Sequence, residues 1–369
     1  MQEIAKEIII IQNSIKTVYG FRRSYIKKLI KLGCRVIILA PNDCVNSRKK
    51  LITLGAEAPL INNRSGFLGM LLVTFQLNLI LLFLRFSTPK ANIVCHFLVT
   101  FLMVGPLLFI LNKKVYLYVE GLGSIFSKNS NKTSLLRWLM LRSNVTRIFC
   151  NNDEKNRLGQ DKDLVTNGIG ISLQKFKLQD RSCILGRDIN LLYVGRLIKD
   201  KGAHDVIDAY RQLAKVSNKS FTLTMLGDTY KNNPSSLTKA EINTYAKEFN
   251  GKLSFPGFSH NPEQFYQNAD ILVLPSKREG FPVCVMEANA MGLPAVCYNV
   301  AGCSDAIQPG VNGVLVQYKD ITALAEAINQ LADEALLKKY HYSARQYAEA
   351  NFNDEIKSDF FVNYITRKL

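Results

Sequence analysis

The sequence has few of the residues that build metal or redox centres. Its eight cysteines include no CxxC pair, and its four histidines form no Cys/His cluster at zinc-binding spacing. This pattern predicts no metal site, and it favours buried, reduced thiols in a cytosolic setting. Internal repeats and low-complexity tracts are also lacking. At 369 residues and 47% apolar composition, the chain is expected to be globular, with two domains.

Acidic residues are scarce in the first half of the chain. Residues 1–180 hold 26 Lys/Arg and 10 Asp/Glu, a net of +16, whereas residues 181–369 hold 21 and 20, a net of +1. A basic half of this size predicts an anionic partner, either nucleic acid, phospholipid or a phosphorylated substrate. Surface lysines that only contact solvent are the alternative.

Short apolar runs alternate with helical segments along the whole chain. Examples are EIIIIQ, RVIILA and KVYLYV in the first half, and INLLYVG, FTLTML and DILVLP in the second, with helices expected over segments such as 203–217 and 320–340. This alternation predicts an α/β fold with parallel sheets covered by helices. We expect one domain over residues 1–170, a second over 171–350, and a linker near 168–186. The opening run MQEIAKEIIIIQNS predicts a buried first strand, not a secretory signal.

Residues 67–84, FLGMLLVTFQLNLILLFL, carry no charge. Their 18 positions reach the lower length limit of a membrane span. Thr74, Gln76 and Asn78 lie in the middle of the run and weaken that interpretation. We therefore expect a helix that packs on the sheet or touches a membrane surface, with a true span as the alternative.

A glycine turn follows the apolar strand that ends at Val194. Gly195 and Arg196 come next, and Lys201 precedes a helix. Such a turn lets backbone N–H groups approach a phosphate, Arg196 can grip two phosphate oxygens, and Lys201 adds positive charge. An ordinary turn with surface lysines has the same pattern. Gly227 lies at the carboxyl end of an expected strand, where ligands bind in open α/β sheets. Backbone groups near Phe258 could contact a base, and a plain loop is the alternative.

The stretch SKREGFPVCVMEANAMG, residues 276–292, places two carboxylates eight positions apart. Pro282 suits the first turn of a helix and Gly292 its end, so that Glu279 lies in the preceding loop and Glu287 about one turn inside. Carboxylates accept hydrogen bonds from hydroxyls, whereas the helix start attracts anions. A ligand with both phosphates and hydroxyls, such as a nucleotide sugar, fits this combination.

The E-x7-E pattern, with GRL…KG upstream and GLPAVCYNVAGCSDAIQPGVNGVLV downstream, resembles glycosyltransferase family 4, whose members are retaining enzymes of the GT-B fold. The resemblance covers essentially the whole chain and is densest over 191–317. YGFRRSYIKKLIKLGCRVIIL, NIVCHFLVTFLMVGPL and YVEGLGSIFS are similar to a branch that acts on bacterial surface polysaccharides, such as O-antigen, capsule or lipid-linked oligosaccharide. The resemblance implies two Rossmann-like domains that face each other across a cleft, with a terminal helix over 351–369 that returns to the first domain.

The resemblance also implies a donor site in the second domain. Arg196 and Lys201 would bind the donor diphosphate, Glu287 the ribose, and Glu279 the transferred sugar and its developing charge. Further donor contacts are expected at Gly20, Gly195, Gly227, Phe258, Gly280, Phe281, Pro282 and Val283, with Gly20 placed in the loop after the first strand.

On the acceptor side, the resemblance implies Arg22, His96 and Glu120, and we count Glu120 with the catalytic residues. Glu120 and His96 each follow or end an apolar strand, so a structural hydrogen-bonding role is the alternative for both. Many relatives have His or Thr at the position of Glu120, and often Lys at that of Thr100. These departures affect the acceptor side. His260 and His341 are expected at the surface.

These observations predict a retaining transferase that moves a hexose or N-acetylhexosamine from a UDP-sugar to a polyprenyl-diphosphate-linked glycan through an α-linkage. No cofactor or metal is expected. The protein would lie on the cytoplasmic face of the inner membrane as a peripheral protein. A nucleotide-sugar epimerase of the same fold is the first alternative. A nucleic-acid-binding protein is the second, and it is disfavoured because the sequence has no recognisable binding module.

Overall fold

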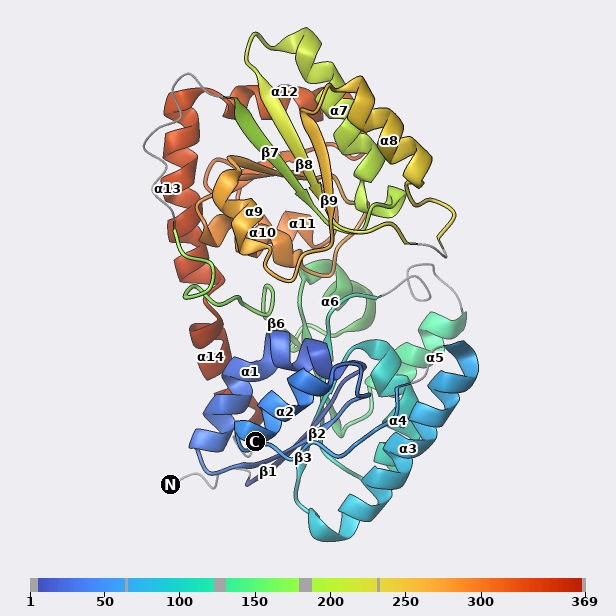
Figure 1. Ribbon diagram of the computed structural model, residues 1–369. Coiled ribbons are helices and arrows are strands. Elements are labelled where there is room, and N and C mark those ends of the chain that lie inside the picture. The colour runs from blue at the N-terminus through green and yellow to red at the C-terminus, as the bar shows by residue number, and fades with distance from the viewer. Residues whose placement is uncertain (1–5, 64–65, 123–130, 179–187, 231–232, 367–369) are drawn as a thin grey trace. The chain divides into compact units, whose positions relative to one another are not determined.

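The computed structural model describes residues 6–63, 66–122, 131–178, 188–230 and 233–366 (Figure 1). The chain divides into two compact units. Unit 1 contains residues 1–169 and 354–369, and unit 2 contains residues 170–353. Each unit has a six-stranded sheet whose ladders are all parallel in the described part of the chain. The predicted α/β class with parallel sheets is thereby confirmed.

Unit 1 has the strand order β2-β1-β3-β4-β5-β6. Its elements are β1 (Glu7–Ile11), α1 (Ile15–Lys31), β2 (Arg35–Leu39), α2 (Val45–Thr53), α3 (Gly66–Ser87), β3 (Asn92–His96), α4 (Leu98–Ile110), β4 (Val115–Val119), α5 (Asn131–Met140), β5 (Val145–Phe149), α6 (Asn152–Leu158), β6 (Leu164–Val165) and α14 (Asp354–Thr366). The strands are buried apolar runs, as expected for a parallel sheet covered on both faces.

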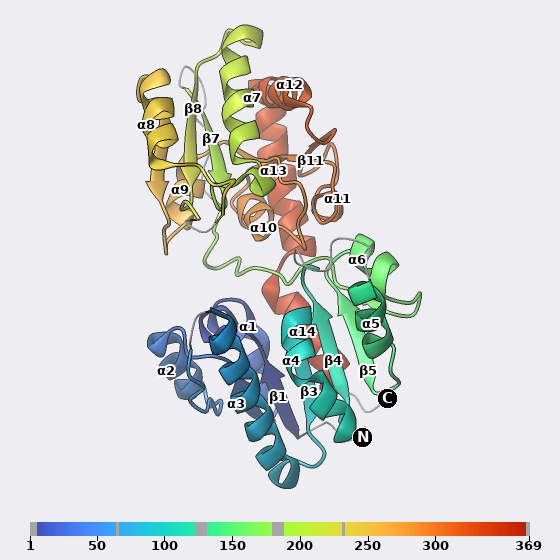
Figure 2. The ribbon, with the colours of Figure 1, turned by 90° about the vertical axis from the view of Figure 1, so that its right-hand side faces the viewer.

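The two faces of this sheet are covered by different helices. Alternate strand residues, such as Ile9, Ile93 and Leu117, join one core cluster with α3 and α4. The other face carries α1 and α14, as Figure 2 shows. The last helix therefore returns to unit 1. It is tied to α1 by Lys28, whose Nζ lies 3.0 Å from Glu355 and 2.6 Å from Asp359.

Helix α3 contains the charge-free run and packs on α4 along one stripe. Gly69, Val73, Leu77 and Leu81 are buried at a spacing of four residues. The Asn78 side chain donates to the Met103 carbonyl of α4 (2.9 Å), so this polar side chain is satisfied by protein. Among the described helices, α3 alone is long and apolar enough to cross a membrane. Of its most apolar stretch of 18 residues, 22% is buried.

Unit 2 has the strand order β12-β11-β10-β7-β8-β9. Its elements are β7 (Ile189–Val194), the 3₁₀ turn η1 (Lys199–Lys201), α7 (Ala203–Val216), β8 (Phe221–Leu226), α8 (Lys239–Glu248), β9 (Leu253–Gly257), α9 (Glu263–Asn268), β10 (Ile271–Leu274), α10 (Val283–Ala290), β11 (Ala295–Tyr298), α11 (Cys303–Ala306), β12 (Gly313–Val316), α12 (Ile321–Leu331) and α13 (Glu334–Asn351).

Three local predictions were wrong. Gly20 lies inside α1 and not in a loop after β1, because Ser14 caps the helix and starts it at Ile15. The segment 320–340 forms two helices, since Asp333 interrupts it and caps α13 by accepting from the Leu336 N–H. His341 is buried, with its Nε2 3.2 Å from the Asp270 carbonyl oxygen. Parts of the predicted linker and of YVEGLGSIFS, at 179–187 and 123–127, lie outside the described residues.

Candidate functional site

The polar groups of unit 2 gather where β7 and β10 lie side by side. From β7 the chain proceeds to β8 on one side, whereas β10 pairs with β7 on the other. This reversal is a topological switch point, and open α/β sheets bind ligands at the carboxyl ends of such strands. Arg196 and Lys201 follow β7, and Glu279 follows β10. The structure thus brings three predicted residues to one edge of the sheet.

Lys201 and Glu279 are in direct contact across this switch point. Lys201 Nζ donates to Glu279 Oε2 at 2.5 Å, and the Ser276 hydroxyl donates to Glu279 Oε1 at 2.7 Å. Both side chains of the ion pair keep some exposure, 24% for Lys201 and 12% for Glu279. Both oxygens of the Glu279 carboxylate are therefore held by hydrogen bonds. No sequence pattern indicated Ser276, which is fully buried and lies two residues after β10 ends at Leu274.

Two glycines allow the surrounding loops to approach each other. Gly202 has φ +75°, and a Cβ there would lie 2.2 Å from the Pro275 carbonyl oxygen. Gly302 has φ +79°, and its Cβ would lie 2.4 Å from the Glu279 carbonyl oxygen. Only glycine fits these two places. The Glu279 N–H also donates to the Ala301 carbonyl (3.0 Å), so the loop of Gly302 supports the loop of Glu279.

Arg196 is exposed at the end of β7, with its guanidinium 5.2 Å from the centre of the Tyr230 ring. Gly195 and Gly227 end neighbouring strands so closely that a Cβ on Gly227 would lie 1.9 Å from the Gly195 carbonyl oxygen. The N–H groups of both glycines donate to backbone carbonyls within the sheet, so the group that an approaching ligand meets there is the fork-shaped cation of Arg196. This geometry suits a diphosphate.

The segment after β9 carries Phe258, whose backbone was predicted to contact a base. The Phe258 N–H donates to the Asp228 carboxylate at 3.1 Å. This N–H is already engaged within the protein, so it is not free to contact a base. The Phe258 ring is 58% exposed and stands edge-on to His260 at 4.9 Å. His260 is exposed, as the sequence predicted.

Glu287 lies in α10, five residues into the helix from Val283. Its Oε2 accepts a hydrogen bond from the Tyr266 hydroxyl at 2.8 Å. Burial raises the pKa of Glu287 to about 7, although the Tyr266 bond and the nearby Lys175 oppose this rise. The carboxyl therefore changes charge near neutral pH. A hydroxyl-bearing ligand would favour the charged form, because a carboxylate accepts hydrogen bonds more strongly.

The residues predicted to contact the donor through backbone lie just before this carboxylate. Gly280 and Phe281 belong to the loop, Pro282 is the N-cap of α10, and Val283 is its first helical residue. Because proline has no side-chain hydrogen-bonding group, the N-cap residue of this helix makes no side-chain cap hydrogen bond. The start of α10 therefore presents backbone amides and the positive end of its dipole.

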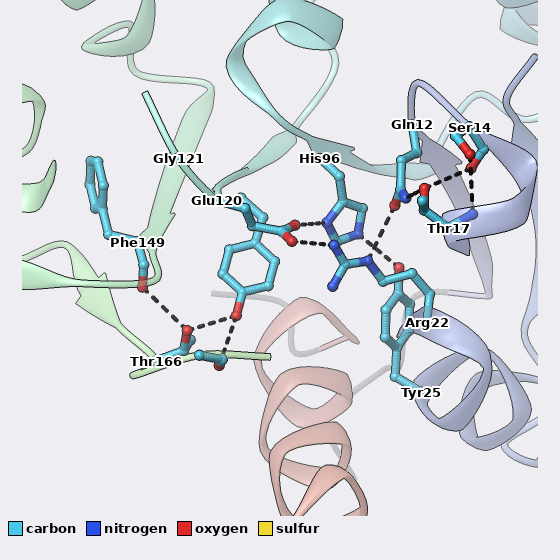
Figure 3. A network of polar contacts seen from close by, with 12 residues as sticks. Gln12, Ser14, Thr17, Arg22, Tyr25, His96, Glu120, Gly121, Phe149 and Thr166 are labelled. Atoms are coloured by element: carbon cyan, nitrogen blue, oxygen red, sulfur yellow. Dashed lines mark hydrogen bonds and ion pairs between the residues drawn. The ribbon is translucent and has the colours of Figure 1, made fainter. Parts of the chain in front are cut away.

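The predicted acceptor residues of unit 1 form a second cluster, at the ends of β1, β3 and β4 (Figure 3). Arg22, 2% exposed, donates from Nε to Gln12 Oε1 at 3.2 Å and from its terminal nitrogen to Glu120 Oε2. Glu120 Oε1 accepts from His96 Nδ1 at 2.7 Å. The structure therefore brings together all three residues predicted for the acceptor side.

His96 is fully buried between Glu120 and Tyr25. Because Nδ1 donates to the carboxylate, Nε2 is the acceptor of the neutral ring and receives the Tyr25 hydroxyl at 2.9 Å. Burial and the charge of Arg22 lower the pKa of His96 to about 4. Burial opposes the ionisation of Glu120, but Arg22 and His96 outweigh it and lower the pKa of that carboxyl. At neutral pH the cluster is a neutral imidazole beside an ion pair.

This geometry favours the structural alternative for His96 and Glu120. Glu120 lies at a strand end as predicted, but its side chain is 8% exposed and both of its oxygens are engaged. The cluster links the segments after β1 and β4 to helix α1. Gln12 and Tyr25 belong to it, and no sequence motif indicated them. Within the described residues, no group of three His, Cys, Asp or Glu side chains could hold a metal ion.

Comparison with known proteins finds similarity that includes the second unit. Residues 175–349 match the family described as "Glycosyl transferases group 1". The capsular polysaccharide biosynthesis glycosyltransferase CapM of Staphylococcus aureus is 29% identical over 196 residues, which span 51% of this chain and 50% of CapM. The N,N'-diacetylbacillosaminyl-diphospho-undecaprenol alpha-1,3-N-acetylgalactosaminyltransferase of Campylobacter jejuni is 26% identical over 87% of this chain and 88% of its own length.

Solved structures share the architecture over nearly the whole chain. HepE from Anabaena, solved with UDP and glucose, has a TM-score of 0.77 at 17% identity and matches 98% of this chain and 99% of its own. The lipopolysaccharide outer core galactosyltransferase WaaB, in its apo form, has a TM-score of 0.69 at 18% identity, over 97% of this chain and 99% of its own. At this identity the likeness establishes the fold, which is GT-B.

Proposed function

We propose that the protein, whose residues 175–349 match the family "Glycosyl transferases group 1", transfers a hexose or N-acetylhexosamine from a UDP-sugar to a lipid-linked glycan in bacterial surface polysaccharide synthesis. The observation that carries this proposal is the Lys201–Glu279–Ser276 group at the switch point of unit 2, with Glu287 in the helix that follows. This arrangement combines a cation that can bind a diphosphate with carboxylates that can accept hydrogen bonds from sugar hydroxyls.

The donor would bind along the carboxyl edge of unit 2. Arg196, Lys201 and the start of α10 would hold the diphosphate and stabilise its charge as the bond to the sugar breaks. Glu287 would accept from the ribose hydroxyls and Glu279 from the sugar. The choice of UDP is supported by HepE, which was solved with UDP and with UDP-glucose. No metal is needed in this scheme, because the cations come from the chain.

We propose transfer with retention and an α-linkage, in keeping with the resemblance to family 4. Glu279 is a poor candidate for a covalent nucleophile, because Lys201 and Ser276 engage both of its oxygens. Retention would then proceed by attack on the same face from which the diphosphate leaves. The Campylobacter relative, whose name specifies a diphospho-undecaprenol acceptor and an alpha linkage, supports the acceptor class and the stereochemistry.

The acceptor would bind to unit 1, at the inner face of the cytoplasmic membrane. Unit 1 holds 27 Lys/Arg and 12 Asp/Glu, a net of +15, whereas unit 2 holds 20 and 18, a net of +2. A basic unit is attracted to anionic lipid surfaces. Helix α3 adds a large exposed apolar face, formed by residues such as Phe67, Leu68, Phe75, Phe83 and Phe86. Both features support peripheral membrane contact.

The direct test is product analysis with the purified protein, a panel of UDP-sugars and a synthetic polyprenyl-diphosphate sugar. We expect a new glycolipid and free UDP, with an α-anomeric signal by NMR. A parallel reaction with donor alone separates the epimerase, because only an epimerase converts the donor without acceptor. Absence of UDP binding, together with tight nucleic-acid binding at physiological salt, would refute the transferase.

A further inference from the structure

A pocket of about 180 Å³ opens in unit 1 between α3 and α4, beside the ends of β1 and β2. Polar residues at its rim, Asn13 and Asn63, are exposed. Val73 and Leu77 on its α3 side are 6% and 1% exposed. The pocket therefore runs from a polar mouth at the carboxyl edge of the sheet into an apolar space between two helices.

The apolar part has room for a short branched hydrocarbon. An engineered apolar cavity of about 150 Å³ holds benzene, a ring of six carbons. An isoprene unit has five carbons and fits the same space. Met70 and Leu77 both line the pocket and lie two turns apart on α3, which is about 10 Å along the helix. This depth accommodates the end of a chain whose head remains at the mouth.

The start of α4 provides a polar end for such a ligand. Thr100, at the third position of α4, lines the pocket and is fully buried, and its hydroxyl has no hydrogen-bond partner in the described part of the chain. A buried hydroxyl without a partner is costly, which indicates a ligand or solvent group beside it. The N-cap residue of α4, Phe97, makes no side-chain cap hydrogen bond, so the first amides of the helix and its dipole also attract an anion.

The backbone at this point is strained. Phe97, the N-cap of α4, has φ +68° and ψ +141°, a conformation that residues other than glycine rarely adopt. Such outliers persist where the surrounding structure requires them, and they cluster at binding sites. Here the strained residue directly follows His96, so the buried cluster of Arg22, Glu120 and His96 fixes the segment from which α4 begins.

The pocket is continuous with the exposed apolar face of α3. Met70 lines the pocket and is also 41% exposed on the helix surface. A lipid chain that lies against α3 can therefore reach the pocket without crossing a polar surface. The basic charge of unit 1 favours an anionic head group.

We propose that this pocket binds the isoprenoid–diphosphate junction of the lipid-linked acceptor. The first isoprene unit would lie between α3 and α4, against Met70, Leu77 and Met103. The diphosphate would lie at the mouth, where the Thr100 hydroxyl and the first amides of α4 donate to it. This inference rests on the proposed transferase function, and it assigns the lipid end of the acceptor to a defined site.

The test uses geranyl diphosphate, a short soluble isoprenoid diphosphate, in calorimetric titrations of the full-length protein. We expect geranyl diphosphate to bind at least tenfold more tightly than inorganic diphosphate or geraniol, because the proposed site binds both the isoprenoid and the diphosphate. A saturating concentration of UDP should leave this affinity unchanged. If UDP displaces the probe, or inorganic diphosphate binds as tightly, the inference is wrong.

Two variants locate the binding site. Val99→Trp, at the exposed rim of the pocket, should weaken geranyl diphosphate binding at least tenfold, whereas Ile110→Trp, at the exposed far end of the same helix, should not change it. Thr100→Val should weaken binding about tenfold through the lost hydroxyl. Thr88→Val is its matched control, since Thr88 is equally buried but donates to the Leu84 carbonyl. Equal binding by Val99→Trp and wild type overturns the proposal.

UDP binding separates failure of this inference from failure of the proposed function. A protein that binds UDP and transfers sugar, but binds geranyl diphosphate no better than geraniol, retains its function and lacks this site. A protein that does neither lacks the function on which the inference rests. Unchanged UDP affinity in each variant shows that the fold is intact.

Discussion

Lys201 Nζ lies 2.5 Å from Glu279 Oε2, and this ion pair joins the segment after β7 to the segment after β10. The family resemblance implies that the lysine binds the donor diphosphate and the glutamate the transferred sugar. In the structure each group is the other's partner. A donor that binds here must draw Lys201 toward its phosphates while Ser276 continues to hold Glu279. In the proposed mechanism, the pair would thus couple the leaving diphosphate to the transferred sugar.

Loss of either charge should reduce turnover more than it reduces donor affinity. We expect Lys201→Ala and Glu279→Gln each to lower kcat by on the order of 100-fold, because both groups act on charge that develops as the diphosphate leaves. Steady-state kinetics with the best UDP-sugar measure this. Lys277→Ala is the control, since Lys277 is 61% exposed in the same loop and its nearest carboxylate oxygen is 3.6 Å away. A kcat near the wild-type value in both site variants would remove the pair from the mechanism.

Donor affinity should depend on the charge of Glu287, whose pKa is raised to about 7 by burial. Only the charged carboxylate accepts from two ribose hydroxyls, so binding should weaken as pH falls through 7. We expect the Kd of a UDP-sugar to rise about tenfold from pH 8 to pH 6. In Glu287→Gln this dependence should disappear. A wild-type Kd that is flat across this range contradicts the assignment.

The Glu287 carboxyl should also make folding stability depend on pH, but in the opposite direction to donor affinity: stability should fall as pH rises. Its pKa is raised from 4.5 to about 7 on folding, so the folded protein binds more protons between these values and loses stability as pH rises through them. Glu287→Gln should therefore unfold at a higher temperature than wild type at pH 8, and with a smaller difference at pH 5. Differential scanning calorimetry at the two pH values provides the comparison.

The buried cluster of unit 1 should behave as a support. Arg22→Met leaves the buried carboxylate of Glu120 without its cationic partner, which costs about 3–5 kcal/mol of folding free energy. Restoring neutrality with Arg22→Met/Glu120→Gln should recover part of the loss. UDP binding, which we assign to unit 2, should survive in whichever variants stay folded. Urea unfolding followed by calorimetric titration measures both quantities.

Acid should destabilise this cluster. The pKa of His96 falls from 6.5 to about 4 on folding and that of Glu120 is also lowered, so the unfolded chain binds more protons in this range. Stability that is complete above pH 6.5 should decrease as pH falls toward 4. This pH range partly overlaps the range between the unfolded and folded pKa values of Glu287. There, the contribution of Glu287 makes the protein less stable as pH rises. His96→Gln and Glu287→Gln should therefore shift the pH profile of the melting temperature in opposite senses.

The elements were predictable because a buried parallel strand is a continuous apolar run that can be recognised locally, as in EIIIIQ and DILVLP. The side-chain partners were not. Lys201 and Glu279 are 78 positions apart, and Tyr25 and His96 are 71 apart, so only the folded sheet brings them together. Gly20 was misplaced for a local reason, because the capping by Ser14 that starts α1 early was overlooked.

Membrane contact through α3 should depend on its exposed aromatic residues. Phe75 and Phe83 are 65% and 69% exposed, and burying each in a lipid surface contributes about 1.5 kcal/mol or more. Phe75→Ser/Phe83→Ser, which removes the apolar area without changing the net charge, should therefore lower binding to phosphatidylglycerol vesicles by on the order of 100-fold. Ile356→Ser, at a residue 55% exposed on α14 at the other face of the sheet, should change it little. Sedimentation with vesicles tests this, and equal losses in both variants would exclude α3 as the contact.

The loop that supports Glu279 offers a test in which backbone strain is matched. Gly302 and Gly310 have nearly the same φ, +79° and +82°, so alanine costs a similar conformational energy at each. At Gly302 the new Cβ would lie 2.4 Å from the Glu279 carbonyl oxygen, whereas at Gly310 nothing lies within 4 Å. Gly302→Ala must therefore displace the Glu279 loop. We expect it to lower kcat at least tenfold, while Gly310→Ala loses only stability. Kinetics below the melting temperature of both variants separate the two effects, and equal activity would show that the position of Glu279 does not depend on this contact.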